Sequence, residues 1–168
     1  MKRRSITIMR CLILSVIVLA LTGVNALSED YDALKDLTSV KALFDFRIGN
    51  PESAAMHLDL ILQTFKDENI AKVTDKPEFA LVFIGPSVKL ISTQREDSSD
   101  EEKESLAKIA DTISEMAKAG IRLEVCLVAV NVMGVDPATI LPEIKQVGNG
   151  YISVIGYQAK GYSLVPVY

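Results

Sequence analysis

The sequence predicts an α/β fold, a three-layer α/β/α sandwich with a mostly parallel sheet of about five strands. Strand-like and helix-like segments alternate from residue 39 onward, which is typical of parallel strands joined by right-handed crossovers. The run FALVFI at 79–84 is continuously apolar, as expected for a central strand that helices cover on both faces.

The first 26 residues have the parts of a secretory signal peptide. Four basic residues among the first ten precede an apolar run at 11–24, and small residues lie near Ala26. A helix of that length spans only about 21 Å, whereas the hydrocarbon core of a membrane is about 30 Å thick. We therefore expect cleavage after Ala26, no membrane segment in the mature protein, and a periplasmic or secreted location.

After cleavage, a polar linker at 27–38 would precede a single domain at 39–168. Export removes four of the 18 basic residues and none of the 22 acidic ones, which changes the net charge from −4 to −8. Such an acidic protein is a poor candidate for binding nucleic acid. The mature chain keeps one cysteine, Cys126, so it cannot form an internal disulfide.

The first half of the domain contains two predicted strands and one helix. Residues 40–46 (VKALFDF) are apolar and rich in β-formers, and Asn50 followed by Pro51 supplies a cap and first residue for a helix. One face of that helix is apolar at Ala54, Ala55, Leu58, Ile61, Leu62 and Phe65. The strand at 79–84 then ends at Gly85-Pro86.

The second half contains a long helix and three further predicted strands. Ser99 and Glu102 form a capping box for a helix that ends at Gly120. A strand begins at 122–125, and Asp136-Pro137 is expected to cap a helix carrying Ile140, Leu141, Ile144 and Val147. Residues 151–155 and 163–167 are the last two predicted strands.

A ligand is expected at the carboxyl ends of these strands, where parallel α/β sheets bind their ligands. The segments predicted to meet there are 47–50, 85–89, the surroundings of Cys126, and 157–162. Their candidate ligand-binding residues are Gly85, Ser87, Gln158 and Tyr162. The Gly85-Pro86-Ser87 segment could offer donors to an anion or form a simple turn, and Asp45 and Arg47 could converge on the pocket or lie in solvent.

Several chemistries are excluded or unsupported by the residue types present. One histidine and one mature cysteine are too few for a zinc site built from these ligands. The sequence has no GxxxxGK[ST], GxGxxG or GxSxG motif, so neither nucleotide binding by such loops nor the common hydrolase elbow is supported. We therefore expect no metal and no cofactor.

The segment RLEVCLVAVNVMGVDP at 122–137 admits two interpretations of Cys126. In one, residues 123–130 form a long strand and the cysteine is a buried, inert hydrophobe; the pattern alone slightly favours this interpretation. In the other, the strand stops near Val125 and a short helix ends at Gly134. Cys126 then lies at a strand-to-helix junction, where the helix dipole favours a thiolate.

Three stretches together resemble the DsrE/DsrF-like family of small sulfur-relay proteins and its secreted, uncharacterised branch. They are FALVFIGPSVKLI at 79–91, GIRLEVCLVAVNVMGVD at 120–136 and GYQAKGYSLVPV at 156–167. The resemblance covers about residues 39–168 and implies a DsrEFH-like fold. It also implies that Cys126 lies at a strand end and carries a persulfide, and that the protein forms trimers or hexamers.

Two functions follow as the main alternatives. The first is a sulfur carrier or sulfurtransferase-like protein in which Cys126 is the catalytic residue and exchanges sulfur with a donor or acceptor protein. The second is a non-enzymatic, exported, oligomeric module that binds a small anionic ligand at the carboxyl ends of the strands. A purely structural oligomer subunit is a third possibility.

Overall fold

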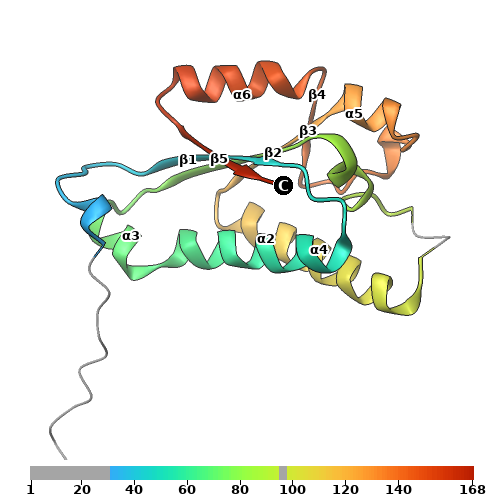
Figure 1. The fold of residues 1–168 in the computed structure, drawn as a ribbon, viewed down its shortest axis with the longest axis horizontal. Coiled ribbons are helices and arrows are strands. Elements are labelled where there is room, and N and C mark those ends of the chain that lie inside the picture. The colour runs from blue at the N-terminus through green and yellow to red at the C-terminus, as the bar shows by residue number, and fades with distance from the viewer. Residues whose placement is uncertain (1–30, 95–97) are drawn as a thin grey trace, which may run out of the picture. The chain divides into compact units, whose positions relative to one another are not determined.

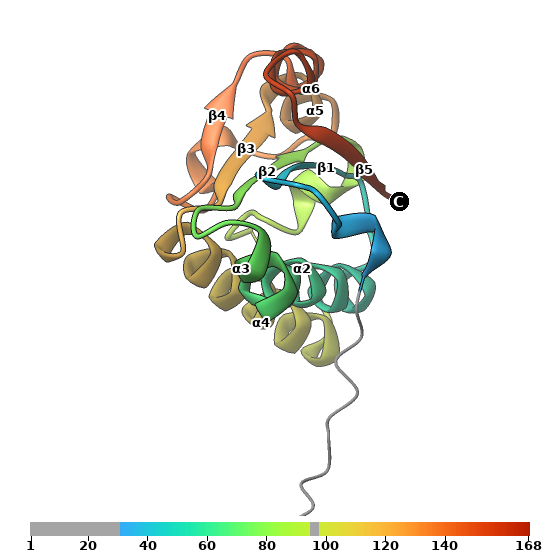
Figure 2. The ribbon, with the colours of Figure 1, turned by 90° about the vertical axis from the view of Figure 1, so that its left-hand side faces the viewer.

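Five parallel strands form the sheet at the centre of residues 34–168 (Figure 1). Their order across the sheet is β4-β3-β2-β1-β5 (Figure 2). The computed structural model describes residues 31–94 and 98–168. The strands are β1 (Lys41–Phe46), β2 (Glu78–Phe83), β3 (Arg122–Cys126), β4 (Lys145–Val147) and β5 (Ser163–Val167). Every pairing is parallel, so the predicted α/β fold is confirmed.

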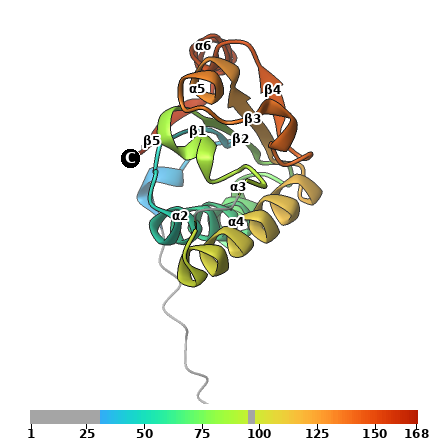
Figure 3. The same ribbon diagram turned by 90° about the vertical axis from the view of Figure 1, so that its right-hand side faces the viewer.

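Helices cover both faces of this sheet, which gives the predicted three layers (Figures 2 and 3). One face carries α2 (Pro51–Lys66), α3 (Glu68–Val73) and α4 (Asp100–Lys118). The other face carries α5 (Leu127–Val132) and α6 (Gly150–Ala159). Three short 3-10 helices complete the described structure: η1 (Asp32–Leu34), η2 (Gly85–Lys89) and η3 (Pro137–Thr139). β2 lies between the two layers, and its residues 79–83 are almost fully buried, as its apolar run predicts.

The predicted starts of the two long helices are confirmed by their capping hydrogen bonds. The backbone N–H of Ser53 donates to Asn50 Oδ1 at 2.9 Å, and Pro51 is the first residue of α2. At α4, the backbone N–H of Glu102 donates to Ser99 Oγ, while the N–H of Ser99 donates to the Glu102 carboxylate. The chain leaves α4 through Gly120 at a φ of 89°.

Two predicted elements are wrong. Residues 151–155 belong to α6 rather than to a strand, because the Asn149 side chain caps this segment and only one side of it, including Gly150 and Val154, is buried. The helix predicted after Asp136-Pro137 is only the 3-10 turn η3, after which residues 145–147 form the edge strand β4. The sheet therefore has the predicted number of strands, but with β4 in place of a strand at 151–155.

The signal peptide predicted for residues 1–26 lies outside the described residues. Of the linker predicted at 27–38, the described part includes the 3-10 turn η1. No helix within residues 31–94 and 98–168 is long and apolar enough to cross a membrane.

Candidate functional site

Cys126 lies at the junction between a strand and a helix. It is the last residue of β3 and the N-cap of α5, with extended backbone angles (φ −77°, ψ 109°). The helix is followed by Gly134, whose φ of 69° suits the left-handed residue that terminates a helix. The interpretation of residues 123–130 as one long strand is therefore wrong. The position at a strand end that the family resemblance implied for Cys126 is confirmed.

The start of α6 packs directly against Cys126. A Cβ placed on Gly150 would lie 2.8 Å from Cys126 Cβ and 3.0 Å from the side chain of Ile84, so no side chain fits there without a shift. The residue Cys126 is only 4% exposed. One N–H at the start of α5, that of Val128, donates to the carbonyl of Gly148 at 3.3 Å. The cysteine is thus enclosed by the loop and helix that follow β4.

The turn after β2 is stabilised by Ser87. Ser87 is fully buried, and its hydroxyl donates to the carbonyl oxygens of Phe46 at 2.9 Å and Ile84 at 3.1 Å. Gly85 begins the turn at a φ of 68°. Because a hydroxyl has a single proton, these bonds leave no donor for an anion. In this structure, Ser87 joins the end of β1 to the end of β2.

Arg47 provides a cation at the same edge of the sheet. Its Nε donates to both carboxylate oxygens of the buried Asp45, at 2.9 and 3.0 Å, and this bond raises the pKa of Arg47 above its ordinary range. The guanidinium also lies 5.4 Å from the ring centre of Tyr151 and 6.0 Å from that of Tyr168. Tyr151 directly follows Gly150, so Arg47 contacts the same turn of α6 that packs against Cys126.

Gln158 and Tyr162 do not lie with Cys126. Helix α6 begins beside Cys126 and runs back across the sheet for ten residues, about 15 Å, before the chain enters β5. Residues 157–162 therefore reach the amino ends of the strands, and the prediction that they meet the other candidate segments is wrong. The Gln158 amide donates to the carbonyl oxygen of Val154 in its own helix, at 3.4 Å.

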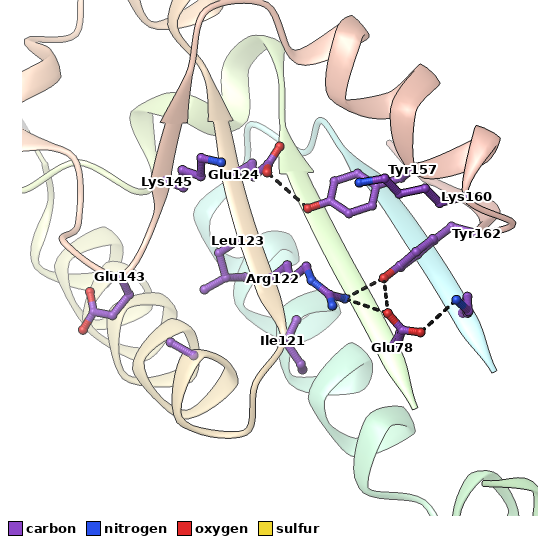
Figure 4. Close-up of a pocket in the computed structure, with 12 residues that line it drawn as sticks. Glu78, Ile121, Arg122, Leu123, Glu124, Glu143, Lys145, Tyr157, Lys160 and Tyr162 are labelled. Carbon is purple, nitrogen blue, oxygen red and sulfur yellow. Dashed lines mark hydrogen bonds and ion pairs between the residues drawn. The ribbon is translucent and has the colours of Figure 1, made fainter. Parts of the chain in front are cut away.

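A cavity of about 850 Å³ lies at this amino edge (Figure 4). Four of the residues that line it are the first residues of their strands: Lys41, Glu78, Arg122 and Lys145. Glu78 Oε1 accepts from Lys41 at 2.9 Å and Glu78 Oε2 accepts from the Tyr162 hydroxyl at 2.8 Å. Arg122 Nη1 lies 3.2 Å from the same Oε2. The hydrogen bonds from Lys41 and then Tyr162 lower the pKa of Glu78 to about 2.

A second carboxylate, that of Glu124, lies deeper in the same cavity. Glu124 Oε1 accepts from the Tyr157 hydroxyl at 3.1 Å, and the rings of Tyr157 and Tyr162 meet edge-to-face at 5.0 Å. Burial, followed by the charge of Glu124, raises the pKa of Tyr157 to about 12. Glu124 and Cys126 are two residues apart in β3, so both side chains face α6.

The sequence prediction missed this cavity, although a signal was present. Glu124 is a charged residue inside the otherwise apolar strand segment LEVC, and a buried carboxylate in a strand often has a function. Within the described ranges, no group of three or more His, Cys, Asp and Glu side chains could hold a metal ion.

The fold and the cysteine define a parallel α/β domain with one thiol at a strand-to-helix junction. The sequence model described as the DsrE/DsrF-like family matches residues 41–167. The chain therefore belongs to the DsrE/DsrF-like family, as its sequence predicted.

Two solved structures of proteins of unknown function are similar to this chain. The first, from Methanobacterium thermoautotrophicum, has a TM-score of 0.57 and 13% identity, and the match covers 76% of this chain and 99% of that one. The second, from Bacteroides thetaiotaomicron, has a TM-score of 0.53 and 18% identity, with 76% and 94% covered. At these identities the likeness shows the fold alone. No curated protein matches this chain.

Proposed function

We propose that this protein is a sulfur carrier in which Cys126 holds a persulfide during sulfur relay. The observation that carries the proposal is the placement of Cys126 as the last residue of β3 and the N-cap of α5, in a chain of the DsrE/DsrF-like family. The thiolate of such a cysteine is the nucleophile in sulfur exchange.

The proposed reaction consists of two sulfur exchanges. The Cys126 thiolate attacks the outer sulfur of a donor persulfide, a bond forms between the two sulfur atoms, and the donor leaves as a thiolate. The outer sulfur of the Cys126 persulfide is then attacked by an acceptor thiolate, and Cys126 leaves as a thiolate in turn. Sulfur moves without net oxidation or reduction, so the reaction requires no cofactor.

Arg47 and the first turn of α6 lie at the same edge of the sheet as Cys126. The Asp45 carboxylate and the rings of Tyr151 and Tyr168 hold the Arg47 guanidinium at the carboxyl edge. Because Cys126 is only 4% exposed and the first turn of α6 packs against it, we propose that this turn shifts when a donor reaches the sulfur. In this proposal, the donor reaches the sulfur of Cys126 through a movement of the first turn of α6.

The test is alkylation of the folded protein as a function of pH, read by intact mass, before and after incubation with a persulfide donor. The proposal expects alkylation at Cys126 without unfolding, and a mass gain of one sulfur atom after incubation with the donor. Cys126→Ser is the matched control, because it replaces only the sulfur atom of the proposed carrier with oxygen. A Cys126 that reacts only after unfolding would refute the proposal.

The burial of Cys126 favours a second candidate function, a non-enzymatic module that binds a small anion at the carboxyl edge. In that case Arg47 binds the anion, because the thiol is buried and the Ser87 hydroxyl already donates to backbone carbonyl oxygens. Thiosulfate is a suitable probe in a thermal-shift measurement. Equal stabilisation of the wild type and of Cys126→Ala, together with loss of the effect in Arg47→Gln, would favour this candidate over sulfur relay.

We further propose that the mature protein is exported and forms a homo-oligomer, a trimer or hexamer, through the layer of α5 and α6. This layer exposes apolar side chains that a monomer would leave in water: Val128, Val132, Tyr151, Ile152 and Ile155. Light scattering on the wild type and on Ile152→Asp tests the assembly, with Leu60→Asp on α2 as the control. A monomeric wild type would contradict it.

A further inference from the structure

The cavity at the amino edge contains a buried carboxylate oxygen with no partner. Glu124 is 8% exposed, its Oε1 is bonded to Tyr157, and its Oε2 accepts no hydrogen bond in the part of the chain that the structure describes. Burial of a polar atom without a partner is unfavourable, so a buried and unpaired carboxylate oxygen indicates a missing donor.

The other charges of the cavity fall into two sets. Glu78 forms ion pairs with both Lys41 and Arg122, so each of these three groups has a partner of opposite charge. In contrast, the ammonium groups of Lys145 and Lys160 have no hydrogen bond or ion pair within residues 31–94 and 98–168. Glu143 also lines the cavity, but its side chain is exposed, so water can serve it. The cavity therefore offers one buried carboxylate that lacks a donor and two ammonium groups that lack an acceptor.

These unpaired charges lie on one side of the cavity. Lys145 is the register partner of Glu124 in the β3–β4 pairing, so the two side chains leave the sheet on the same face. Within the described residues, these two side chains nevertheless form no ion pair with each other. Figure 4 shows Glu124 between Lys145 and Tyr157, with Lys160 beyond Tyr157 at the end of α6.

We propose that this cavity binds a small molecule carrying both an ammonium group and a carboxylate, an α-amino acid or a short peptide. The ligand ammonium donates to Glu124, and the ligand carboxylate accepts from Lys145 and Lys160. The volume of about 850 Å³ lies within the range of roughly 300–1,000 Å³ that is usual for small-molecule sites. The proposal goes beyond sulfur relay, because it uses no residue of the carboxyl edge.

The surroundings of Glu124 suit this recognition. The Tyr157 hydroxyl anchors one carboxylate oxygen, and the ring of Tyr162 supports Tyr157 from the side. The terminal torsion of a glutamate is broad, so a modest rotation of the carboxyl group can turn its unpaired oxygen toward a ligand. Recognition of the two ends of the ligand by opposite charges would also reject molecules that carry only one of them.

The test is titration calorimetry of the full chain with four probes of similar size. L-Alanine and L-alanyl-L-alanine carry both charges, N-acetyl-L-alanine lacks the ammonium, and L-alaninamide lacks the carboxylate. The proposal expects binding of at least one doubly charged probe, weakened about tenfold or more when either charge is removed. Whichever of L-alanine and L-alanyl-L-alanine binds more tightly shows whether the ligand is an amino acid or a short peptide.

Variants of the lining residues locate the binding in this cavity. Glu124→Gln and Lys160→Met are each expected to weaken the doubly charged probe about tenfold or more, whereas Glu101→Gln on α4 leaves its affinity unchanged. Lys160 is exposed, so its variant tests the site even if Glu124→Gln fails to fold. Absence of binding by both doubly charged probes, or affinities that neither lining variant changes, would overturn the proposal.

Discussion

The two edges of the sheet differ in how much space they leave around their functional groups. At the carboxyl edge, Gly150 allows α6 to begin against Cys126, and the buried Ser87 bonds to two carbonyl oxygens. At the amino edge, four strands begin with charged residues around an open cavity. This difference is consistent with the two proposals: sulfur exchange at the enclosed Cys126 of the carboxyl edge, and recognition of a charged small molecule at the amino edge.

The largest effect is expected from Gly150→Ala, which tests the close packing at the carboxyl edge. Its new Cβ would lie 2.8 Å from Cys126 Cβ, so we expect a loss of about 1–3 kcal/mol in the free energy of unfolding. The matched control is Gly148→Ala, because a Cβ at Gly148 meets nothing within 4 Å. Urea unfolding measures the free energy of unfolding of both variants. Equal stabilities of the two variants would show that the packing around Cys126 is loose.

The next effect is expected from Ser87→Ala. Removal of the hydroxyl leaves the carbonyl oxygens of Phe46 and Ile84 without this donor in a buried turn, which should cost about 1–2 kcal/mol of unfolding free energy. Ser163→Ala, at an exposed position of β5, serves as the control and should change stability by less than about 0.5 kcal/mol. If Ser87→Ala is as stable as this control, the serine is free to serve a ligand instead.

Much of the fold was predictable because its boundaries are encoded locally. Asn50-Pro51 and the Ser99–Glu102 box specify helix starts whose capping groups lie within four residues of one another. The segment at 151–155 was mispredicted, since its β-branched residues have high β-propensity. Its conformation depends on tertiary packing, because Gly150 and Val154 contact the sheet on one side while Ile152 and Ile155 remain exposed.

The position of Cys126 was predictable only through the family resemblance, and the amino-edge cavity was not predicted at all. Its residues are far apart in the sequence and become neighbours through strand register, as with Lys41 beside Glu78 and Glu124 beside Lys145. Register depends on the packing of whole strands, which a local pattern does not specify. The sequence did place a charged residue within β3, but the topology was needed to show what surrounds it.

The smallest effect concerns Glu78 and sharpens the account of the amino edge. Bonds from Lys41 and Tyr162 lower the pKa of Glu78 from 4.5 to about 2. A carboxylate with a lowered pKa stabilises the folded state fully above pH 4.5 and loses this contribution as the pH falls through about 2. The stability of the wild type relative to Glu78→Gln should therefore be constant above pH 4.5 and decrease between pH 4.5 and 2.

The measurement is urea unfolding of the wild type and Glu78→Gln at several pH values across that window. The effect should be modest, because the Glu78 side chain is 34% exposed and water and salt screen its ion pairs. Glu101→Gln removes an exposed carboxylate on α4 and serves as the comparison for a charge lost outside the amino edge. If both variants follow the same pH dependence, Glu78 gains nothing from its partners, and the amino edge is a set of independently solvated charges rather than a preformed site.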